Sequence, residues 1–353
     1  MAGREGVSWP RRLRAVRAAL RRLHEISRRE SVFDEYDGHL LLAFCLIATT
    51  SQAPAIRRDA LAMGLERARA WRRRWPRIRR HLQHDTIMRE VIASYAIDRM
   101  GAGDDRIRDE LRSALSGYAA RDLLFFDPRL ETAPRDVPED CKCGRLNERG
   151  CTRCTACRQR LRAHSQYELW YYALTSAYFC ERQGMPLRVG VVDLVRQTPM
   201  LRPYPAPDSA DYYQAIYAVT HLVYTLSDYG AARLPRTWLR QERRFLKSAM
   251  RWAIDTGEAD TIGEVVDSLA VLGVEDGDPL MLEGRTFLLE AQQADGGWGD
   301  EDADPYGQFH TLWTAIDGLR DYGWRGTAAA DRTLRRVVRE LAADSSGGRR
   351  TPS

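Results

Sequence analysis

Apolar residues recur along the chain in dense stretches, each of which opens on Asp or Ser, and several of which close on Gly. These stretches indicate helices, because Asp and Ser are favoured at a helix N-cap and Gly directly after a helix end. Six of them follow one pattern, the first more loosely than the others. They begin at Asp34, Asp85, Ser165, Asp211, Asp260 and Asp304. The recurrence predicts one kind of helix repeated along the chain.

Amphipathic segments alternate with the apolar stretches. An example is LRQERRFLKSAMRWAI from Leu239, whose charged positions fall on one helical face. The segments are 9–28, 54–75, 104–124, 187–197, 235–255, 279–293 and 328–343. Six apolar helices alternating with about six amphipathic ones predict an all-α fold. We expect an (α/α)6 toroid with the apolar helices inside, and an open solenoid of helical hairpins is the alternative.

The segments between helices are unequal in length, which bears on domain organisation. We expect one domain over residues 1–343, an insertion at 126–164 and a disordered tail at 344–353, which contains SSGGRRTPS. The long connections 125–164, 198–210 and 294–303 each lead into an apolar helix. They should therefore gather at one rim of the toroid, where the helix N-termini create a positive potential. Long loops on a rigid scaffold are where function concentrates.

Composition places the chain among ordinary globular proteins with a core, since 44% of its residues are hydrophobic and 29% are charged. The arginine-rich N-terminal segment has no apolar stretch of the secretory kind. The longest apolar run, Leu40–Ala48, is far shorter than the roughly 20 residues of a membrane span. We therefore expect no membrane span, a cytoplasmic location and reduced thiols.

Positive charge is densest in RARAWRRRWPRIRRHLQH, residues 67–84. This segment could form a patch for RNA, phosphate or an acidic partner. The simpler interpretation is the solvated face of a helix whose Trp and Ile side chains point inward. No known nucleic-acid motif accompanies the segment, so we do not expect a nucleic-acid partner.

Five of the seven cysteines form the pattern Cys-x-Cys-x7-Cys-x2-Cys-x2-Cys between residues 141 and 157. In a reducing compartment such a cluster predicts a metal site rather than disulfides. Four thiolates suit tetrahedral Zn²⁺ and leave no open coordination position, so the zinc would be structural. An iron–sulfur cluster and unbound or redox-active thiols are the alternatives. The candidate ligands are Cys151, Cys154 and Cys157 with Cys141 or Cys143, and His164 is a substitute for the fourth.

The stretch GRTFLLEAQQADGGWGDEDADPYGQFHTLWTAIDGL, residues 284–319, resembles the repeat of the squalene-cyclase and protein-prenyltransferase superfamily. The matching positions are Phe287, Leu288, Gln292, Asp295, Gly296, Gly297, Trp298 and Gly299. The resemblance implies an α/α toroid whose central cavity often holds isoprenoid substrates. It also implies that Gln292 caps a turn on which Trp298 stacks.

The resemblance does not carry over the activity of either branch of the superfamily. Terpene cyclases of the protonating class use an Asp-x-Asp-Asp motif before an inner helix, and neither GEADTIGE (257–264) nor DEDADPYG (300–307) reproduces it. Protein prenyltransferases bind catalytic zinc through Asp, Cys and His. His310 matches that histidine in position, but no Asp-x-Cys partner precedes it.

One stripe of the repeated helices carries the residues best suited to chemistry. Positions two, six, ten and thirteen residues after each expected N-cap share one helical face. In the three clearest repeats these positions are Tyr167, Tyr171, Thr175 and Tyr178, then Tyr213, Tyr217, His221 and Tyr224, then Tyr306, His310, Thr314 and Asp317. The corresponding positions after Asp260 are Ile262, Val266, Ala270 and Gly273. We expect this stripe to face the cavity, although buried tyrosines and histidines that only link helices are the simpler alternative.

These observations predict a biosynthetic enzyme of prenyltransferase-like or terpene cyclase-like fold, in specialised metabolism, that acts on a hydrophobic or isoprenoid-like molecule. The expected catalytic residues are His310, His221, Tyr217, Tyr306 and Asp317. The expected substrate-binding residues are Tyr167, Tyr171, Tyr213 and Trp313. A second metal could bind at His221 and His310 with Asp317, Glu168 or His39. The alternative is a non-catalytic scaffold that binds a peptide or protein through its cysteine-rich rim.

Overall fold

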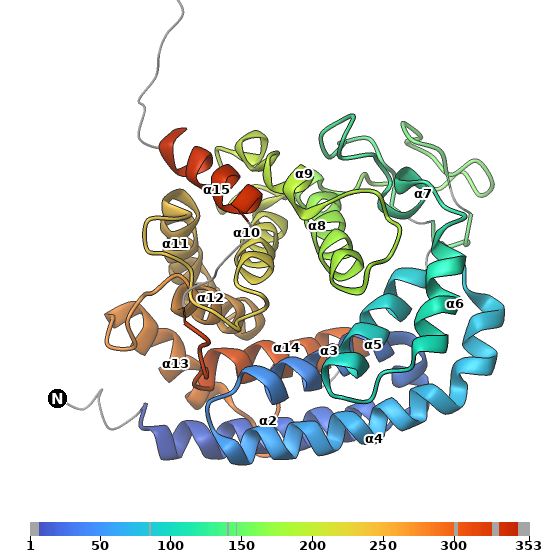
Figure 1. Ribbon diagram of the computed structural model, residues 1–353. Coiled ribbons are helices and arrows are strands. Elements are labelled where there is room, and N and C mark those ends of the chain that lie inside the picture. Colours follow the sequence, from blue (N-terminus) through green and yellow to red (C-terminus); the bar gives the residue numbers. More distant parts are fainter. Residues whose placement is uncertain are drawn as a thin grey trace, which may run out of the picture.

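The computed structural model describes residues 7–84, 86–139, 141–145, 147–299, 303–326 and 332–344 (Figure 1). Over these ranges the chain forms fourteen α-helices and two short 3-10 helices, η1 (Arg79–His81) and η2 (Thr198–Leu201), and it has no strand beyond isolated bridges. The all-α prediction is confirmed. Asp85, expected as a helix cap, and residues 345–353 of the expected tail lie outside the described ranges, whereas Asp344 is the last residue of a helix.

Six largely buried helices correspond to the six apolar stretches of the sequence. They are α3 (Glu30–Thr50), α5 (Ile87–Arg99), α8 (Gln166–Gln183), α10 (Tyr212–Leu226), α12 (Ala259–Val271) and α14 (Pro305–Leu319). Each contacts the next in this order, and α14 contacts α3. Side chains from all six line one cavity, so we call them the cavity helices.

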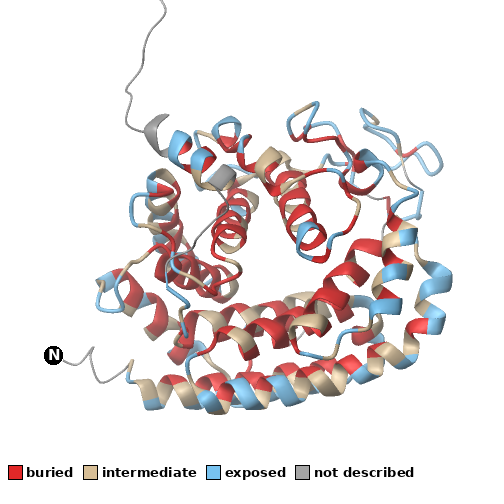
Figure 2. Cartoon of the chain, in the orientation of Figure 1, coloured by how far each residue is buried: buried red, intermediate tan, exposed pale blue. Residues whose placement is uncertain are grey.

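The other helices lie against the outer sides of the cavity helices (Figure 1). They are α2 (Trp9–Ser27), α4 (Pro54–Ile78), α6 (Asp105–Leu115), α7 (Ala120–Leu124), α9 (Val191–Val195), α11 (Arg240–Thr256), α13 (Pro279–Ala291) and α15 (Arg332–Asp344). Figure 2 shows their buried faces turned inward and their exposed faces turned out, as amphipathic segments require. Among the contacts are α2 with α14, α4 with α3, and α11 with α12.

Two expected amphipathic helices are shorter or divided in the structure. Segment 104–124 forms α6 and α7, separated by a turn at Gly117, and segment 187–197 contains only the five-residue α9. In addition, α11 begins at Arg240 rather than near Pro235. The predicted extent of these helices was wrong, because Gly117 lies in the turn between α6 and α7 and Gly190 is the N-cap of α9.

The arginine-rich segment lies mostly in α4, and its two tryptophans point inward. Trp71 and Trp75 are each 1% exposed. Trp71 Nε1 donates to Glu90 at 2.8 Å, and Trp75 Nε1 donates to Glu110 at 2.7 Å. These contacts match the interpretation of the segment as a helix with a buried aromatic face and a charged outer face.

The Gln292–Trp298 segment connects α13 to α14 and contacts α2. Gln292 Nε2 donates to the carbonyl oxygens of Ala15 at 3.0 Å and Gly296 at 3.1 Å. Trp298 is 4% exposed, and its Nε1 donates to the Leu288 carbonyl at 2.7 Å. The motif residues of the sequence therefore fix the turn that leads into α14, the helix that carries His310.

Candidate functional site

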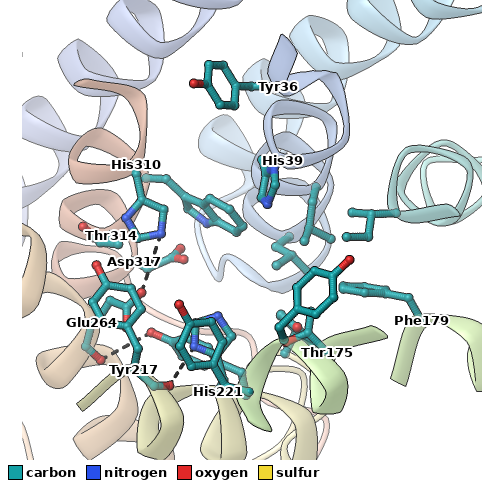
Figure 3. A pocket seen from close by; sticks show the side chains of 18 of the residues that line it. Tyr36, His39, Thr175, Phe179, Tyr217, His221, Glu264, His310, Thr314 and Asp317 are labelled. Atoms are coloured by element: carbon teal, nitrogen blue, oxygen red, sulfur yellow. Dashed lines mark hydrogen bonds and ion pairs between the residues drawn. The ribbon is translucent and has the colours of Figure 1, made fainter. Parts of the chain in front are cut away.

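A cavity of about 320 Å³ lies among the six cavity helices (Figure 3). This volume is at the lower end of the range typical of small-molecule sites. Seven of the nine residues that the sequence predicted as catalytic or substrate-binding line it. They are His310, His221, Tyr217, Tyr306, Asp317, Tyr171 and Trp313.

The other two predicted residues, Tyr167 and Tyr213, are not among the lining residues. Tyr167 is buried between helices, and its hydroxyl donates to the Leu201 carbonyl at 3.1 Å. Tyr213 is 38% exposed and its hydroxyl lies 2.9 Å from that of Tyr217. Both stand in the first turn of their helices, but position alone does not exclude them, because Tyr306 at the matching position of α14 lines the cavity.

Asp260, in the first turn of α12, joins three helices at the cavity wall. Its Oδ1 accepts hydrogen bonds from His310 Nδ1 at 2.8 Å and Thr314 Oγ1 at 2.9 Å, both on α14. Its Oδ2 accepts from the hydroxyls of Tyr217 and Tyr213, on α10. Such a set of donors stabilises the charged carboxylate and fixes the His310 ring.

Glu264 lies one turn further along α12 and faces the second nitrogen of His310. Glu264 Oε1 is 3.7 Å from His310 Nε2 (Figure 3), and Oε2 accepts a hydrogen bond from Thr220 Oγ1 at 2.6 Å. His310 thus lies between two carboxylates of one helix. Glu264 is 2% exposed and lines the cavity, so it can contact a bound molecule.

These three groups hold protons at very different pH values. Burial opposes ionisation of Asp260, but the charge of His310 and the donated hydrogen bonds outweigh it and lower the pKa to about 2. Burial likewise disfavours charged His310, but Asp260 raises its pKa to about 9. Burial raises the pKa of Glu264 to about 7, against the opposing charge of His310. Near neutral pH, Asp260 and His310 form an ion pair and Glu264 is the group that exchanges a proton.

A second charged cluster lies beyond Glu264. Arg320 Nε donates to Asp317 Oδ1 at 2.6 Å, and Arg320 Nη1 donates to Thr50 Oγ1 at 2.8 Å. Burial raises the pKa of both Asp317 and Asp267. The pKa of Asp267 is raised well above its usual value, because the nearby charge of Asp317 also opposes its ionisation. Asp317, predicted as catalytic, is therefore engaged with a buried arginine.

His221 and His39 face the same cavity as neutral rings. Burial lowers the pKa of each to about 4. His221 Nδ1 lies 2.8 Å from the Tyr217 carbonyl of its own helix, and its ring stacks on that of Tyr171 at 4.8 Å.

The structure does not group the ligands predicted for a second metal. Glu168 is not among the residues that line the cavity, and its carboxylate lies 3.0 Å from His164. In the described part of the chain, three candidate ligand atoms come together only at the cysteine cluster, so the expected second metal at the histidines finds no such grouping.

The sequence missed the acidic face of α12. The stripe counted from Asp260 as an N-cap predicted Ile262 and Val266 toward the cavity, but these side chains pack near Gly284 of α13. The N-cap of α12 is Glu258, so Asp260 lies inside the helix and the stripe is displaced. Glu264 and Asp267 line the cavity instead, and Asp260 bonds to the cavity-lining His310. The sequence did contain a signal for this face, namely three carboxylates at positions i, i+4 and i+7 of an otherwise apolar helix.

Four cysteines, Cys141, Cys143, Cys154 and Cys157, bring their sulfur atoms within 4.8 Å of one another and could hold a metal ion. Three of the sulfur–sulfur distances are 3.4, 3.4 and 3.6 Å. Tetrahedral zinc–thiolate bonds of about 2.3 Å require sulfurs about 3.8 Å apart, whereas a disulfide requires about 2.05 Å. The backbone N–H of Cys157 lowers the pKa of Cys154 to about 6, which favours a thiolate there.

Cys151, predicted as a ligand, is outside this quartet and only packs beside it. The sequence predicted that only one of Cys141 and Cys143 would be a ligand, but both belong to the quartet. The reason is the path of residues 151–161, which form a hairpin with bonds from Leu161 N to the Thr152 carbonyl at 3.0 Å and from Cys154 N to the Gln159 carbonyl at 2.8 Å. This hairpin turns Cys154 and Cys157 toward the 141–143 segment.

The cysteine-rich insertion adjoins the cavity wall. His164, at its end, contacts the ring of Phe125 with centroids 5.8 Å apart, and Phe125 contacts the cavity-lining Tyr172 at 6.2 Å. The insertion is therefore placed to support α8 at the side of the cavity. Within the described ranges no helix combines the length and the hydrophobicity needed to cross a membrane.

A family model described as a domain of unknown function (DUF6895) matches residues 158–309. The matched stretch spans α8 to α13 and the first residues of α14, and it contains Tyr171, Tyr217, His221, Asp260 and Glu264. No curated protein and no solved structure matches the chain.

Proposed function

We propose that the chain is an enzyme that carries out acid/base chemistry on a hydrophobic, isoprenoid-like small molecule held in the cavity. The observation that carries the proposal is Glu264 beside the Asp260–His310 ion pair in an aromatic-lined cavity. A buried acid with a pKa near neutrality can donate or accept a proton at physiological pH. Glu264 would transfer the proton, and His310 would stabilise its carboxylate form.

The fold proposed with this function is the (α/α)6 toroid of prenyltransferases and squalene cyclases. Its support is the succession of contacts among the cavity helices, which returns from α14 to α3. A further support is the Gln292–Trp298 turn, where Gln292 donates to the Gly296 carbonyl as the resemblance implies and Trp298 is tied to α13 through the Leu288 carbonyl. The toroid explains why one cavity collects side chains from six helices far apart in sequence.

The rival function, a scaffold that binds a peptide through its cysteine-rich rim, predicts a lumen filled by side chains. The cavity instead extends to both His221 and His310. This observation favours the enzyme.

Turnover with a panel of compounds tests the proposal. Purified protein is incubated with linear isoprenoid alkenes, alcohols and diphosphates, and products are followed by liquid chromatography and mass spectrometry. We expect Glu264→Gln to lower product formation by about 10²–10⁴-fold, the usual contribution of a general acid or base. The matched control is Glu168→Gln, which removes a carboxylate of α8 outside the cavity. Equal turnover by Glu264→Gln and the native chain would contradict the role of Glu264, and conversion of no compound would contradict the isoprenoid class.

We also propose that the cysteine quartet binds one structural Zn²⁺, because four thiolates in near-tetrahedral spacing match its preference. Elemental analysis of the purified chain should find about one zinc per chain. Cys154→Ser should lose the metal and make the 126–164 segment sensitive to protease. Cys151→Ser, the matched control in the same loop, should keep the metal and resist the protease as the native chain does. Stoichiometric iron with visible absorption would replace zinc by an iron–sulfur cluster.

A further inference from the structure

The cavity contains more carboxyl groups than cations to pair with them. His310 is paired with Asp260, and Arg320 is paired with Asp317. Arg89, at the wall, is paired with Asp37 and Glu90. Two buried carboxyl groups of the lining, Glu264 and Asp267, lie on α12, where Glu264 shares His310 with Asp260; Glu35, also in the lining, is exposed. Glu264 and Asp267 are each at most 3% exposed, and Glu264 is the more distant of the two carboxylates around His310.

Asp267 has an oxygen without a donor. In the described part of the chain, no hydrogen-bond partner reaches its buried Oδ1. A buried acceptor left unpaired destabilises a protein, and a positively charged ligand beside it would offset that loss. The same helix therefore presents two carboxyl groups to the cavity, and one of them has an unused acceptor.

The walls of the cavity are suited to positive charge in a second way. The protein's own cations already lie on aromatic faces: His310 stacks on Tyr306 with ring centroids 5.0 Å apart, and the Arg320 guanidinium lies 3.9 Å from the centroid of Tyr322. Further rings, from Tyr171, Tyr224, Tyr229, Phe179 and Trp313, line the remaining surface. Aromatic faces attract cations by their quadrupoles, most strongly where water is excluded.

We infer that the cavity recognises a ligand with a cationic centre, an apolar or aromatic ammonium compound, whose charge lies against Glu264 and Asp267 and whose hydrocarbon part lies against the tyrosine rings. The inference shares the cavity with the proposed function and names the class of its ligand. Both carboxyl groups are neutral or partly neutral when no cation is present, since burial raises their pKa values. Binding therefore releases protons, and affinity rises with pH.

Binding of benzyltrimethylammonium tests the inference, and neopentylbenzene, in which carbon replaces the nitrogen, is the uncharged comparison. We expect the full chain to bind the ammonium at least about tenfold more tightly, by titration calorimetry at pH 8. The affinity for the ammonium should fall by several fold between pH 8 and pH 6. In the double variant Glu264→Gln/Asp267→Asn, both the preference and the pH dependence should disappear.

The amide variants resemble the protonated side chains, so they should fold, and circular dichroism with a thermal melt checks this. Glu168→Gln again serves as the control and should bind as the native chain does. Equal affinity for the two probes, or an undiminished preference in the double variant, would overturn the inference. Preference for the ammonium without any isoprenoid turnover would leave the inference standing and contradict the proposed function. Isoprenoid turnover that depends on Glu264, without a preference for the ammonium, would support the proposed function and overturn the inference.

Discussion

Asp260 and Glu264 lie one turn apart on the same helix, yet one is a strong acid and the other a weak one. The difference comes from their donors. Asp260 accepts from His310, Thr314 and two tyrosine hydroxyls, whereas within the described ranges the Glu264 carboxylate accepts one hydrogen bond, from Thr220. Hydrogen bonds and a nearby positive charge stabilise the ionised form, and burial without them favours the neutral form.

The two raised pKa values give stability a defined pH dependence. The pKa of His310 rises from 6.5 to about 9, so its contribution is complete below pH 6.5 and is lost as pH rises through 9. The pKa of Glu264 rises from 4.5 to about 7, so ionising it destabilises the fold increasingly between pH 4.5 and 7. We expect the free energy of unfolding to fall from pH 5 to 9 by roughly 6 kcal/mol, about 3 kcal/mol from each group.

Urea denaturation across this pH range measures the effect in variants. Glu264→Gln should remove the fall between pH 4.5 and 7, and His310→Gln should remove the fall between pH 6.5 and 9. His81→Gln, in an exposed part of η1, should leave the profile unchanged. Parallel profiles for the native chain and both site variants would show that these groups are not linked to folding.

The sequence indicated much of this site but not its centre. Counting from N-caps placed His310, His221 and the tyrosines on one stripe, because Asp304 is indeed an N-cap that bonds Gly307 N at 2.7 Å. The same count failed on α12, where Asp260 binds side chains instead of capping the helix. Whether an aspartate caps its own helix or reaches another one depends on tertiary contacts, which no local pattern contains.

At the scale of the element, the turn between α13 and α14 illustrates how a short motif fixes a helix. Gly296 and Gly299 both have positive φ, of 91° and 80°. A Cβ at Gly296 would lie 2.8 Å from the backbone carbon of Ala18 in α2, whereas a Cβ at Gly299 would meet nothing within 4 Å. The two glycines thus share a backbone conformation but differ in their surroundings.

This pair makes a matched experiment. Gly299→Ala should lower the free energy of unfolding by about 1–2 kcal/mol, the cost of an L-residue at positive φ. Gly296→Ala should lower it by a further 1–3 kcal/mol, roughly the cost of forcing extra volume into a packed contact. Chemical denaturation of the two variants gives both values. Equal losses would mean that the contact with α2 does not constrain the turn.

The element scale also shows where sequence reasoning succeeds for metal sites and where it stops. Spacing identified the cysteine-rich segment, because clustered thiols are rare without a metal. It did not select the four ligands, since Cys151 has the same spacing to Cys154 as Cys154 has to Cys157. The hairpin path decides between them, and that path depends on hydrogen bonds of the folded loop.

At the scale of the whole molecule, the first helices of the chain are bonded to the last cavity helix. Arg12 of α2 donates to the Leu319 carbonyl at 3.1 Å and to Asp321 at 2.7 Å. Arg320 donates to Ser51, after α3, at 3.2 Å. Periodicity predicted these helices individually, but the pairing of segments some 300 residues apart came only with the structure.

These contacts predict that the two ends of the chain lose order together. Arg12→Ala should destabilise the fold by about 1–3 kcal/mol, because it leaves the buried Leu319 carbonyl unpaired and removes the ion pair with Asp321. Amide hydrogen exchange should then increase in α14 as well as in α2, although α14 lies at the other end of the sequence. Arg14→Ala, an exposed arginine of the same helix, is the control. Faster exchange confined to α2 would contradict coupling between the ends and the single domain predicted for the chain.

The cysteine-rich insertion leaves the helical body and returns to it at one place. Pro138 and Ala163 form an antiparallel bridge, Glu139 N donates to the Arg162 carbonyl at 2.9 Å, and His164 N donates to the Val137 carbonyl at 2.8 Å. Because the two ends already lie side by side, a two-residue turn could join them without moving α7 or α8. We expect that this segment can be removed to give a protein without the cysteine cluster, or replaced by a reporter peptide whose signal follows events at the neighbouring cavity.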